Sequence, residues 1–282
     1  MSGPAIGVAL APVSRRVDVD PLTGAVTPDR VPPCASAADL AALEVALRLA
    51  EAWQATVTAV TVGSDAAEPL LRDALARGAD DAIRVEPGNE TSPPGMPPAL
   101  AATAEALAVA FGDRPVVLCG EHGDDGGTGT VPALLAAHGD RAQALGLTAV
   151  EPGPEPGTVS AERRLDRGWR ERLLIRAPMV LSVESGAGRI RRAALPAVLA
   201  ARQARIPVLS GAGPTSSGDL MIVAPYRPPA RVVPVPVGAS PLERVVQVIG
   251  IAADREPPRR VEAEPSAAAA EIFEQLRRWG YL

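Results

Sequence analysis

Short apolar runs alternate with longer segments of helical spacing along the first 140 residues. The apolar runs, several of them β-branched and bounded by Gly or Pro, predict buried parallel strands at residues 6–11, 56–62, 82–85 and 115–119. Between them, apolar positions that share one helical face predict helices at residues 36–52, at residues 65–77, up to Phe111 and from residue 131 to about 138. Repeated strand–helix units predict an α/β fold on a doubly wound, mostly parallel sheet.

Two residues indicate where helices begin and end. Ser36 precedes the first helical segment and is expected to be its N-cap. Gly78 follows the second helical segment, where a C′ glycine commonly ends a helix.

The pattern changes after residue 140. Alternating positions predict antiparallel strands at residues 158–165, 170–176 and 179–183, with Asp166-Arg167-Gly168 as a hairpin turn. A short helix is expected around residues 195–203. The hairpin therefore extends the parallel sheet.

From residue 211 onward, Pro and Gly recur every few residues, which predicts an extended tail. One amphipathic helix at about residues 266–279 ends the tail, with Ile272, Leu276 and Trp279 at helical spacing. We therefore expect an α/β domain at residues 1–210 and a Pro-rich C-terminal tail at residues 211–282.

Composition excludes several classes of protein. All 28 basic residues are arginine, which excludes Schiff-base, P-loop and kinase-type lysines. The net charge of −5 argues against nucleic-acid binding. Cys34 and Cys119 form no CxxC motif, so neither a zinc site nor a disulfide framework is indicated. With no basic n-region and no apolar run long enough to cross a bilayer, a cytoplasmic protein without membrane insertion is expected.

One glycine-rich loop, residues 123–130, leads from the fourth strand into a helix. Successive backbone N–H groups and the positive helix end are suited to a phosphate. The alternative is a flexible connector that uses Gly for tight turns. Asp124 and Asp125 would repel a phosphate if they faced it, and could instead bind a ribose or cap the helix.

Two further features carry weaker signals. Cys119 and His122 are three residues apart, which places their side chains on opposite faces of the sheet, so a loop histidine without catalytic function is favoured. Residues 162–205 hold eleven Arg and four acidic residues, net +7. This segment is either a solvated hairpin face or a surface that docks on an acidic protein.

Several segments in the same order resemble the β subunit of electron transfer flavoprotein. They include Ala42–Leu49, Val60–Gly63, Leu71–Asp80 and Ala194–Arg202, and the hairpin and the final helix also fit. The resemblance implies a sheet of the adenine-nucleotide alpha-hydrolase (HUP) type. It also implies a heterodimer with an α subunit that holds the redox-active FAD and carries electrons from a dehydrogenase to the respiratory chain. The use of arginine in place of lysine resembles that of proteins encoded by high-GC genomes. Within the family, the chain also resembles a divergent subgroup linked to the peptide-derived cofactor mycofactocin.

In the family, the β subunit closes one side of the flavin cleft and binds a second nucleotide, AMP or FAD, rather than acting as an acid–base catalyst. No catalytic or metal-binding residue is therefore expected. Ser36-Ala37-Ala38-Asp39 stands where the family has Asn-Pro-Phe-Asp, and Gly129 stands where Gln is typical. The segment after the first strand, Val13–Arg16, lacks the family's aromatic residue. The residues carried over to the nucleotide pocket are Ala9, Ser36, Ala37, Ala38, Asp39, Val62, Asp124, Asp125, Gly126, Gly127, Thr128, Gly129 and Thr130.

Leu195 matches the family's recognition-loop leucine, which inserts into a pocket of the partner dehydrogenase, and Arg191 and Arg192 lie beside it in sequence. The alternative places Leu195 in the core of its own helix. Two other functions stay open: a stand-alone adenine-nucleotide sensor, and a scaffold subunit that has lost its nucleotide.

Overall fold

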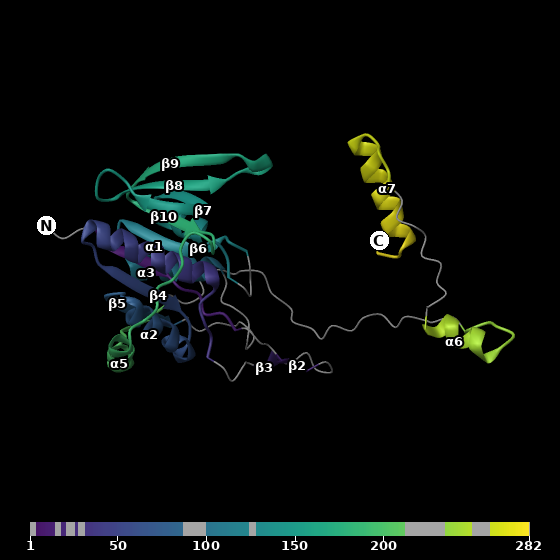
Figure 1. Cartoon of the computed structure of the whole chain (residues 1–282), viewed down its shortest axis with the longest axis horizontal. Coiled ribbons are helices and arrows are strands. Elements are labelled where there is room, and N and C mark those ends of the chain that lie inside the picture. Colours follow the sequence, from purple (N-terminus) through teal and green to yellow (C-terminus); the bar gives the residue numbers. More distant parts are fainter. Residues whose placement is uncertain are drawn as a thin grey trace. The chain divides into compact units, whose positions relative to one another are not determined.

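The computed structural model describes residues 4–14, 18–20, 26–27, 32–86, 100–123, 128–211, 235–249 and 260–281 (Figure 1). The chain divides into two compact units, Met1–Tyr226 and Arg227–Leu282. The domain boundary expected at residue 210 stays a prediction.

A nine-stranded sheet with the order β11-β5-β4-β1-β6-β10-β7-β8-β9 forms the first unit. All strand pairs from β11 to β7 are parallel, and β7-β8-β9 are antiparallel. The doubly wound, mostly parallel sheet with a hairpin extension is therefore confirmed. The strands are β1 (Ile6–Ala9), β4 (Val57–Val62), β5 (Asp81–Glu86), β6 (Val116–Gly120), β7 (Ala142–Pro152), β8 (Thr158–Arg164), β9 (Arg170–Arg176), β10 (Met179–Val183) and β11 (Val208–Ser210), and β2 (Asp18–Val19) pairs with β3 (Val26–Thr27).

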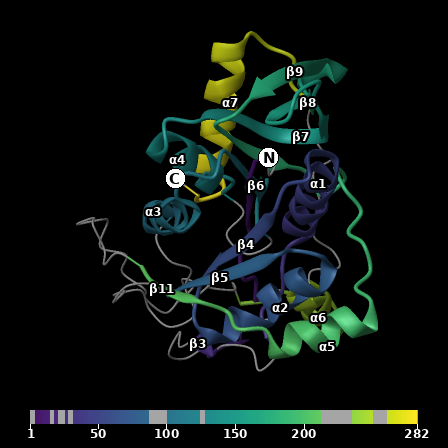
Figure 2. The same ribbon diagram turned by 90° about the vertical axis from the view of Figure 1, so that its left-hand side faces the viewer.

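Helices cover both faces of the parallel part of the sheet (Figure 2). On one face, α1 (Ala37–Trp53) and α2 (Glu68–Arg77) pack on side chains such as Ile6, Val8 and Leu118. On the other face, α3 (Leu100–Phe111) and α4 (Val131–His138) pack on side chains such as Val60, Val117 and Val180. Every residue of β1, β4, β6 and β10 is buried, as expected for central parallel strands.

The local signals for two helix ends are confirmed. Ser36 is the N-cap of α1, and its Oγ accepts a hydrogen bond from the backbone N–H of Asp39 at 3.0 Å. Gly78 ends α2 with φ +118°, a left-handed conformation that glycine adopts without strain. The short 3-10 turns are η1 (Asp65–Ala67) and η2 (Asp166–Gly168), and η2 lies in the predicted hairpin turn.

The prediction that residues 179–183 form an antiparallel strand is wrong. This segment is β10, which lies between β6 and β7 and is parallel to both. All five of its residues are buried, so it is a central strand covered on both faces rather than a half-exposed one. Strand β7 was not predicted; its pairing with both β8 and β10 shifts register, and Gly146 adopts a positive φ within it.

The last helix among the described residues of the first unit is α5 (Leu195–Gln203), which confirms the short helix expected there. In the second unit, α7 (Pro265–Arg278) matches the predicted terminal helix, but α6 (Pro241–Ile249) was not predicted. Its start carries a capping box: Ser240 Oγ accepts from the N–H of Glu243 at 3.2 Å, and Glu243 Oε2 accepts from the N–H of Ser240 at 3.4 Å. The tail beyond residue 211 therefore contains two helices among its described residues.

Candidate functional site

Strands β1 and β6 separate at their carboxyl ends. They pair as far as Val8 and Leu118. Beyond that point the N–H of Leu10 donates to the carbonyl of Val60 on β4 at 2.9 Å, and the N–H of Glu121 donates to the carbonyl of Val183 on β10 at 2.9 Å. The chain order reverses between β1 and β6, and open α/β sheets bind ligands at such a switch point.

The Asp39 side chain bridges this separation from the first turn of α1. Its Oδ2 accepts a hydrogen bond from the N–H of Ala11, and its Oδ1 accepts one from the N–H of Gly120, both at 3.2 Å. Asp39 is 5% exposed. Burial raises the pKa of its carboxyl group to about 6, although hydrogen bonds from Ser36, Ala11 and Gly120 act in the opposite direction.

Gly120 allows α1 to approach the end of β6. A Cβ at this position would lie 2.6 Å from Oδ1 of Asp39, 2.7 Å from its backbone nitrogen and 2.9 Å from the carbonyl carbon of Ala38. No larger residue fits without moving the start of the helix.

The described end of the glycine-rich loop lies beside the end of β6. Gly129 has φ +63°, and a Cβ there would lie 2.9 Å from the carbonyl oxygen of Glu121, the residue after Gly120. The hydroxyl oxygens of Thr128 and Thr130 are 3.2 Å apart. Thr130 immediately precedes α4, so the segment Thr128–Thr130 leads from the end of β6 to the helix N-terminus. The predicted site residues Asp124, Asp125, Gly126 and Gly127 lie outside the described residues.

The other predicted pocket residues have different roles. Ala9 and Val62 end their strands and are buried in the core on the side of α3 and α4. Ala38 is buried, whereas Ala37 is exposed. The structure thus brings Ser36, Ala38 and Asp39 together with Ala11 and Gly120, two residues that the sequence pattern did not single out.

Cys119 and His122 do not form a reactive pair. Cys119 is buried in the core, where burial and the negative charge of Asp39 raise the pKa of its thiol. A protonated thiol is a poor nucleophile. His122 is exposed, and its Nδ1 lies 3.6 Å from Glu121 Oε2. Among the described residues, no group of three or more His, Cys, Asp or Glu side chains is arranged to hold a metal ion.

A second candidate site lies at α5. Leu195 is 70% exposed and Leu199 is 51% exposed, which does not fit the alternative that Leu195 is a core residue. Ala201 is the one residue of this helix that is buried. Among its neighbours in sequence, Arg189, Arg192 and Arg202 are exposed, so the segment presents both leucines and arginines to solvent.

Polar contacts hold the segment that carries Leu195. Arg191 binds Glu44 of α1 with its Nε and Nη2 at 3.0 Å each, and its backbone N–H donates to Glu44 Oε2 at 3.1 Å. These contacts, with Glu51, raise the pKa of Arg191. Arg191 was expected to face a docking partner, but its guanidinium group secures the segment to α1. Arg72 and Arg77 of α2 donate to backbone carbonyls of the same segment.

The matches to known proteins cover most of the first unit. The electron transfer flavoprotein domain matches residues 23–212. The chain is 31% identical over 206 residues to protein FixA of Rhizobium meliloti, covering 71% of this chain and 70% of that protein. It is 30% identical over 202 residues to protein FixA of Bradyrhizobium diazoefficiens (69% and 68%), and 32% identical over 177 residues to the electron transfer flavoprotein subunit beta of Thermoanaerobacterium thermosaccharolyticum (61% and 64%).

Proposed function

Because the chain belongs to the electron transfer flavoprotein family and is of the β-subunit type, we propose that it pairs with an α-like subunit that holds FAD. The heterodimer carries electrons from a dehydrogenase to the respiratory chain. The observation that carries this proposal is the match over residues 23–212, which includes every parallel strand after β1 and the helix α5. FAD supplies the redox chemistry when it is bound.

The region where the ends of β1 and β6 separate is the proposed site for AMP or another second nucleotide. Its position at the switch point supports this, as does the close approach of Gly129 to the carbonyl of Glu121. Thr128 and Thr130 offer hydroxyl groups next to the N-terminus of α4, where a phosphate is favoured. Asp39 already uses both carboxylate oxygens on backbone N–H groups, so it supports the pocket rather than binding the phosphate.

The flavin itself is expected to contact the α subunit more than this chain. Of the seven aromatic residues, Phe111 and Trp53 are buried, and Trp169 lies in the hairpin turn. There is no lysine to polarise the flavin ring. This chain is therefore proposed to close one side of the cleft without binding the flavin ring by stacking.

We propose that Leu195 is the anchor for the partner dehydrogenase. An exposed leucine near three exposed arginines suits an apolar pocket with an acidic rim. Opposite charges at the rim accelerate association, and the apolar anchor contributes affinity. Brief, reversible contacts of this kind fit an electron carrier that serves a donor and then an acceptor.

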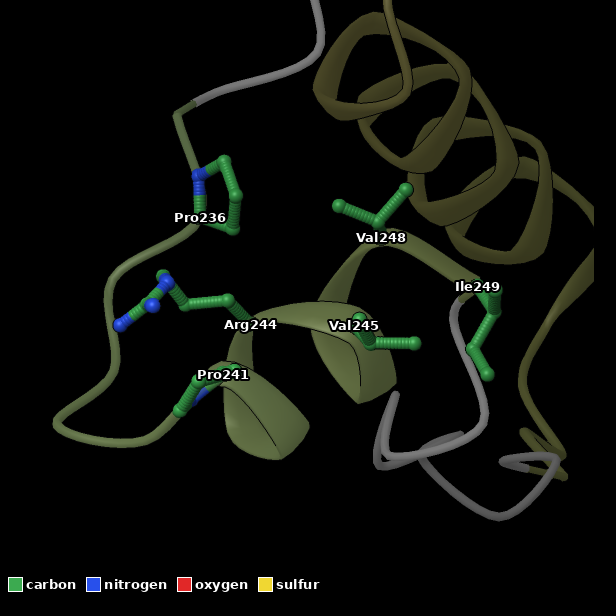
Figure 3. A pocket seen from close by; sticks show the side chains of 6 residues that line it. All are labelled: Pro236, Pro241, Arg244, Val245, Val248 and Ile249. Carbon is green, nitrogen blue, oxygen red and sulfur yellow. The ribbon is translucent and has the colours of Figure 1, made fainter.

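The second unit is proposed to pack on the α subunit. Among their described residues, α6 and α7 bury none. Pro236, Val245, Val248 and Ile249 line a shallow apolar pocket with Pro241 and Arg244 (Figure 3). Phe273 and Trp279 of the terminal segment are also exposed. Exposed apolar side chains at this density are typical of a surface that a partner covers.

A cytoplasmic location is part of the proposal. Cys34 and Cys119 are both free thiols, as is usual in a reducing compartment. In the described part of the chain, no helix combines the length and the apolar character needed to cross a membrane.

Co-expression with an electron transfer flavoprotein α-like subunit from the same genome tests the proposal. Size-exclusion chromatography with light scattering should show a one-to-one heterodimer. Denaturing the complex should release AMP or a second nucleotide, which chromatography then identifies. A monomer or homodimer that carries adenine nucleotide but does not bind the α-like subunit would identify a stand-alone sensor. A heterodimer that releases no nucleotide besides FAD would identify a scaffold subunit.

A further inference from the structure

The contacts of Asp39 replace hydrogen bonds that the sheet itself cannot make. After Val8 and Leu118 the neighbouring strands β1 and β6 no longer pair, so the N–H groups of Ala11 and Gly120 face the gap between them. An unpaired N–H in a buried position is unfavourable. One carboxylate with two acceptor oxygens satisfies both donors at 3.2 Å each. Asparagine would place its NH2 group, a donor, opposite one of these two N–H groups.

The position of Asp39 in the helix holds the carboxylate in place. Its own N–H donates to Ser36 Oγ at 3.0 Å, and Ser36 is fully buried. The carboxylate therefore lies at the positive end of α1, where an anion is favoured. Since the chain supplies this anion itself, a ligand phosphate is directed away from α1 and toward the segment Thr128–Thr130.

The contact between α1 and β6 is close enough to fix the distance between them. The missing Cβ of Gly120 leaves space that Asp39 Oδ1 and the backbone of Ala38 and Asp39 occupy. On the other side of the gap, the Thr61 hydroxyl donates to the carbonyl of Leu10 at 2.8 Å and holds the end of β1 to β4. A shift of Asp39 would therefore move the backbone at the ends of both β1 and β6.

We propose that Asp39 is the positioning residue of the nucleotide site: by joining the backbone after β1 to the end of β6, it sets the spacing of the strand ends at which the nucleotide binds. This inference rests on the proposed nucleotide function. Asp39 acts through Ala11 and Gly120 and does not contact the nucleotide. Glu44, a second buried acid of the same helix, binds Arg191 instead of the strand ends and provides a matched comparison.

The test measures AMP binding by calorimetry on nucleotide-stripped αβ complex, with Asp39→Asn, Gly120→Ala and the control Glu44→Gln. Asp39→Asn should weaken AMP binding at least about tenfold, because an unpaired N–H group at Ala11 or Gly120 would shift the strand ends away from the spacing that suits the nucleotide. Gly120→Ala, which displaces the same carboxylate, should have a similar effect. Glu44→Gln should lower the melting temperature but change AMP affinity by less than about twofold.

The outcomes separate the inference from the function on which it rests. If the wild-type complex does not bind AMP, ADP or FAD at this second site, the proposed nucleotide function fails. If the wild type binds AMP but Asp39→Asn and Gly120→Ala bind it equally well, the positioning role is refuted. Equal losses of affinity in Asp39→Asn and Glu44→Gln would also overturn it, because they would show a general loss of stability. If Asp39→Asn does not fold, Gly120→Ala alone decides.

Discussion

Arg72 on α2 donates a hydrogen bond from Nη1 to the carbonyl oxygen of Ala201 on α5, at 2.8 Å. The same nitrogen lies 2.9 Å from the carbonyl oxygen of Arg202 and 3.0 Å from that of Ala204. The last carbonyls of a helix have no partner within the helix, and a cation there also interacts favourably with the helix dipole. Glu68 holds the guanidinium group in place through Nη2 at 3.2 Å. A helix that buries only one residue is thus held by polar contacts, which leaves its leucines exposed.

Arg72→Met should loosen α5. The variant keeps most of the aliphatic side chain but loses these hydrogen bonds, so the free energy of unfolding should fall by about 1–2 kcal/mol. Hydrogen exchange should accelerate at the amides of residues 198–204. Arg48→Met is the matched control, because Arg48 donates to the carbonyl of Val150 on β7 instead. Equal exchange at α5 in both variants would show that Arg72 does not secure the helix.

Leu195→Ala should weaken docking without affecting the fold. Burial of a leucine in a partner pocket contributes roughly 1.5–3 kcal/mol, or about ten- to a hundredfold in affinity for the donor dehydrogenase. Because Leu195 is 70% exposed, its removal should leave the melting temperature unchanged. Val109→Ala serves as control, since Val109 is 68% exposed on α3. A drop in melting temperature with undiminished electron transfer would contradict the anchor role.

Asp39 should make stability depend on pH. Its pKa is about 6 in the folded chain against an ordinary value of 3.8, so between these values the folded state binds more protons than the unfolded state. Stability contributed by this group therefore rises as pH falls through about 6 and is complete near the ordinary value. Relative to Asp39→Asn, the wild type should gain up to about 3 kcal/mol between about pH 7 and about pH 4. Urea unfolding across this range measures the difference, and parallel curves for the two proteins would contradict it.

Gly129→Ala should reduce nucleotide binding more than its backbone strain alone explains. At φ +63° an alanine costs about 1 kcal/mol, and its Cβ would also press on the carbonyl of Glu121. Gly112→Ala is the control, since Gly112 has φ +56° and open space around it. Both variants should lose stability, but only Gly129→Ala should weaken AMP binding, as measured by calorimetry. If Gly129→Ala binds AMP with wild-type affinity, the glycine-rich loop is a simple connector that does not bind the nucleotide.

Local signals in the sequence were sufficient for much of the fold. Ser36 and Gly78 placed helix ends correctly because capping depends on neighbours three or four residues away. The capping box of Ser240 and Glu243 was equally readable, but the surrounding prolines favoured an extended tail. The orientation of β10 could not be read locally, since its parallel pairing depends on β6 and β7.

The candidate sites were harder to predict because distant residues build them. The family resemblance pointed to Asp39, but the hydrogen bond between Gly120 and Asp39 joins residues 81 positions apart. The contact between Arg191 and Glu44 spans 147 positions, so no local pattern indicated that Arg191 was already engaged. Exposure of Leu195, by contrast, followed from the resemblance and agrees with the structure.

The visible absorption spectrum of the purified chain, with and without its α-like subunit, tests most directly whether the chain works as the β-type subunit of an electron transfer flavoprotein. The chain alone should be colourless, since it has no lysine and few aromatic residues to hold a flavin ring. The one-to-one complex should be yellow because its α-like subunit holds one FAD. The donor dehydrogenase should reduce that FAD. Stoichiometric flavin in the isolated chain would instead identify FAD as the second nucleotide. An α-like subunit that binds FAD but forms no complex with this chain would contradict the β-subunit role.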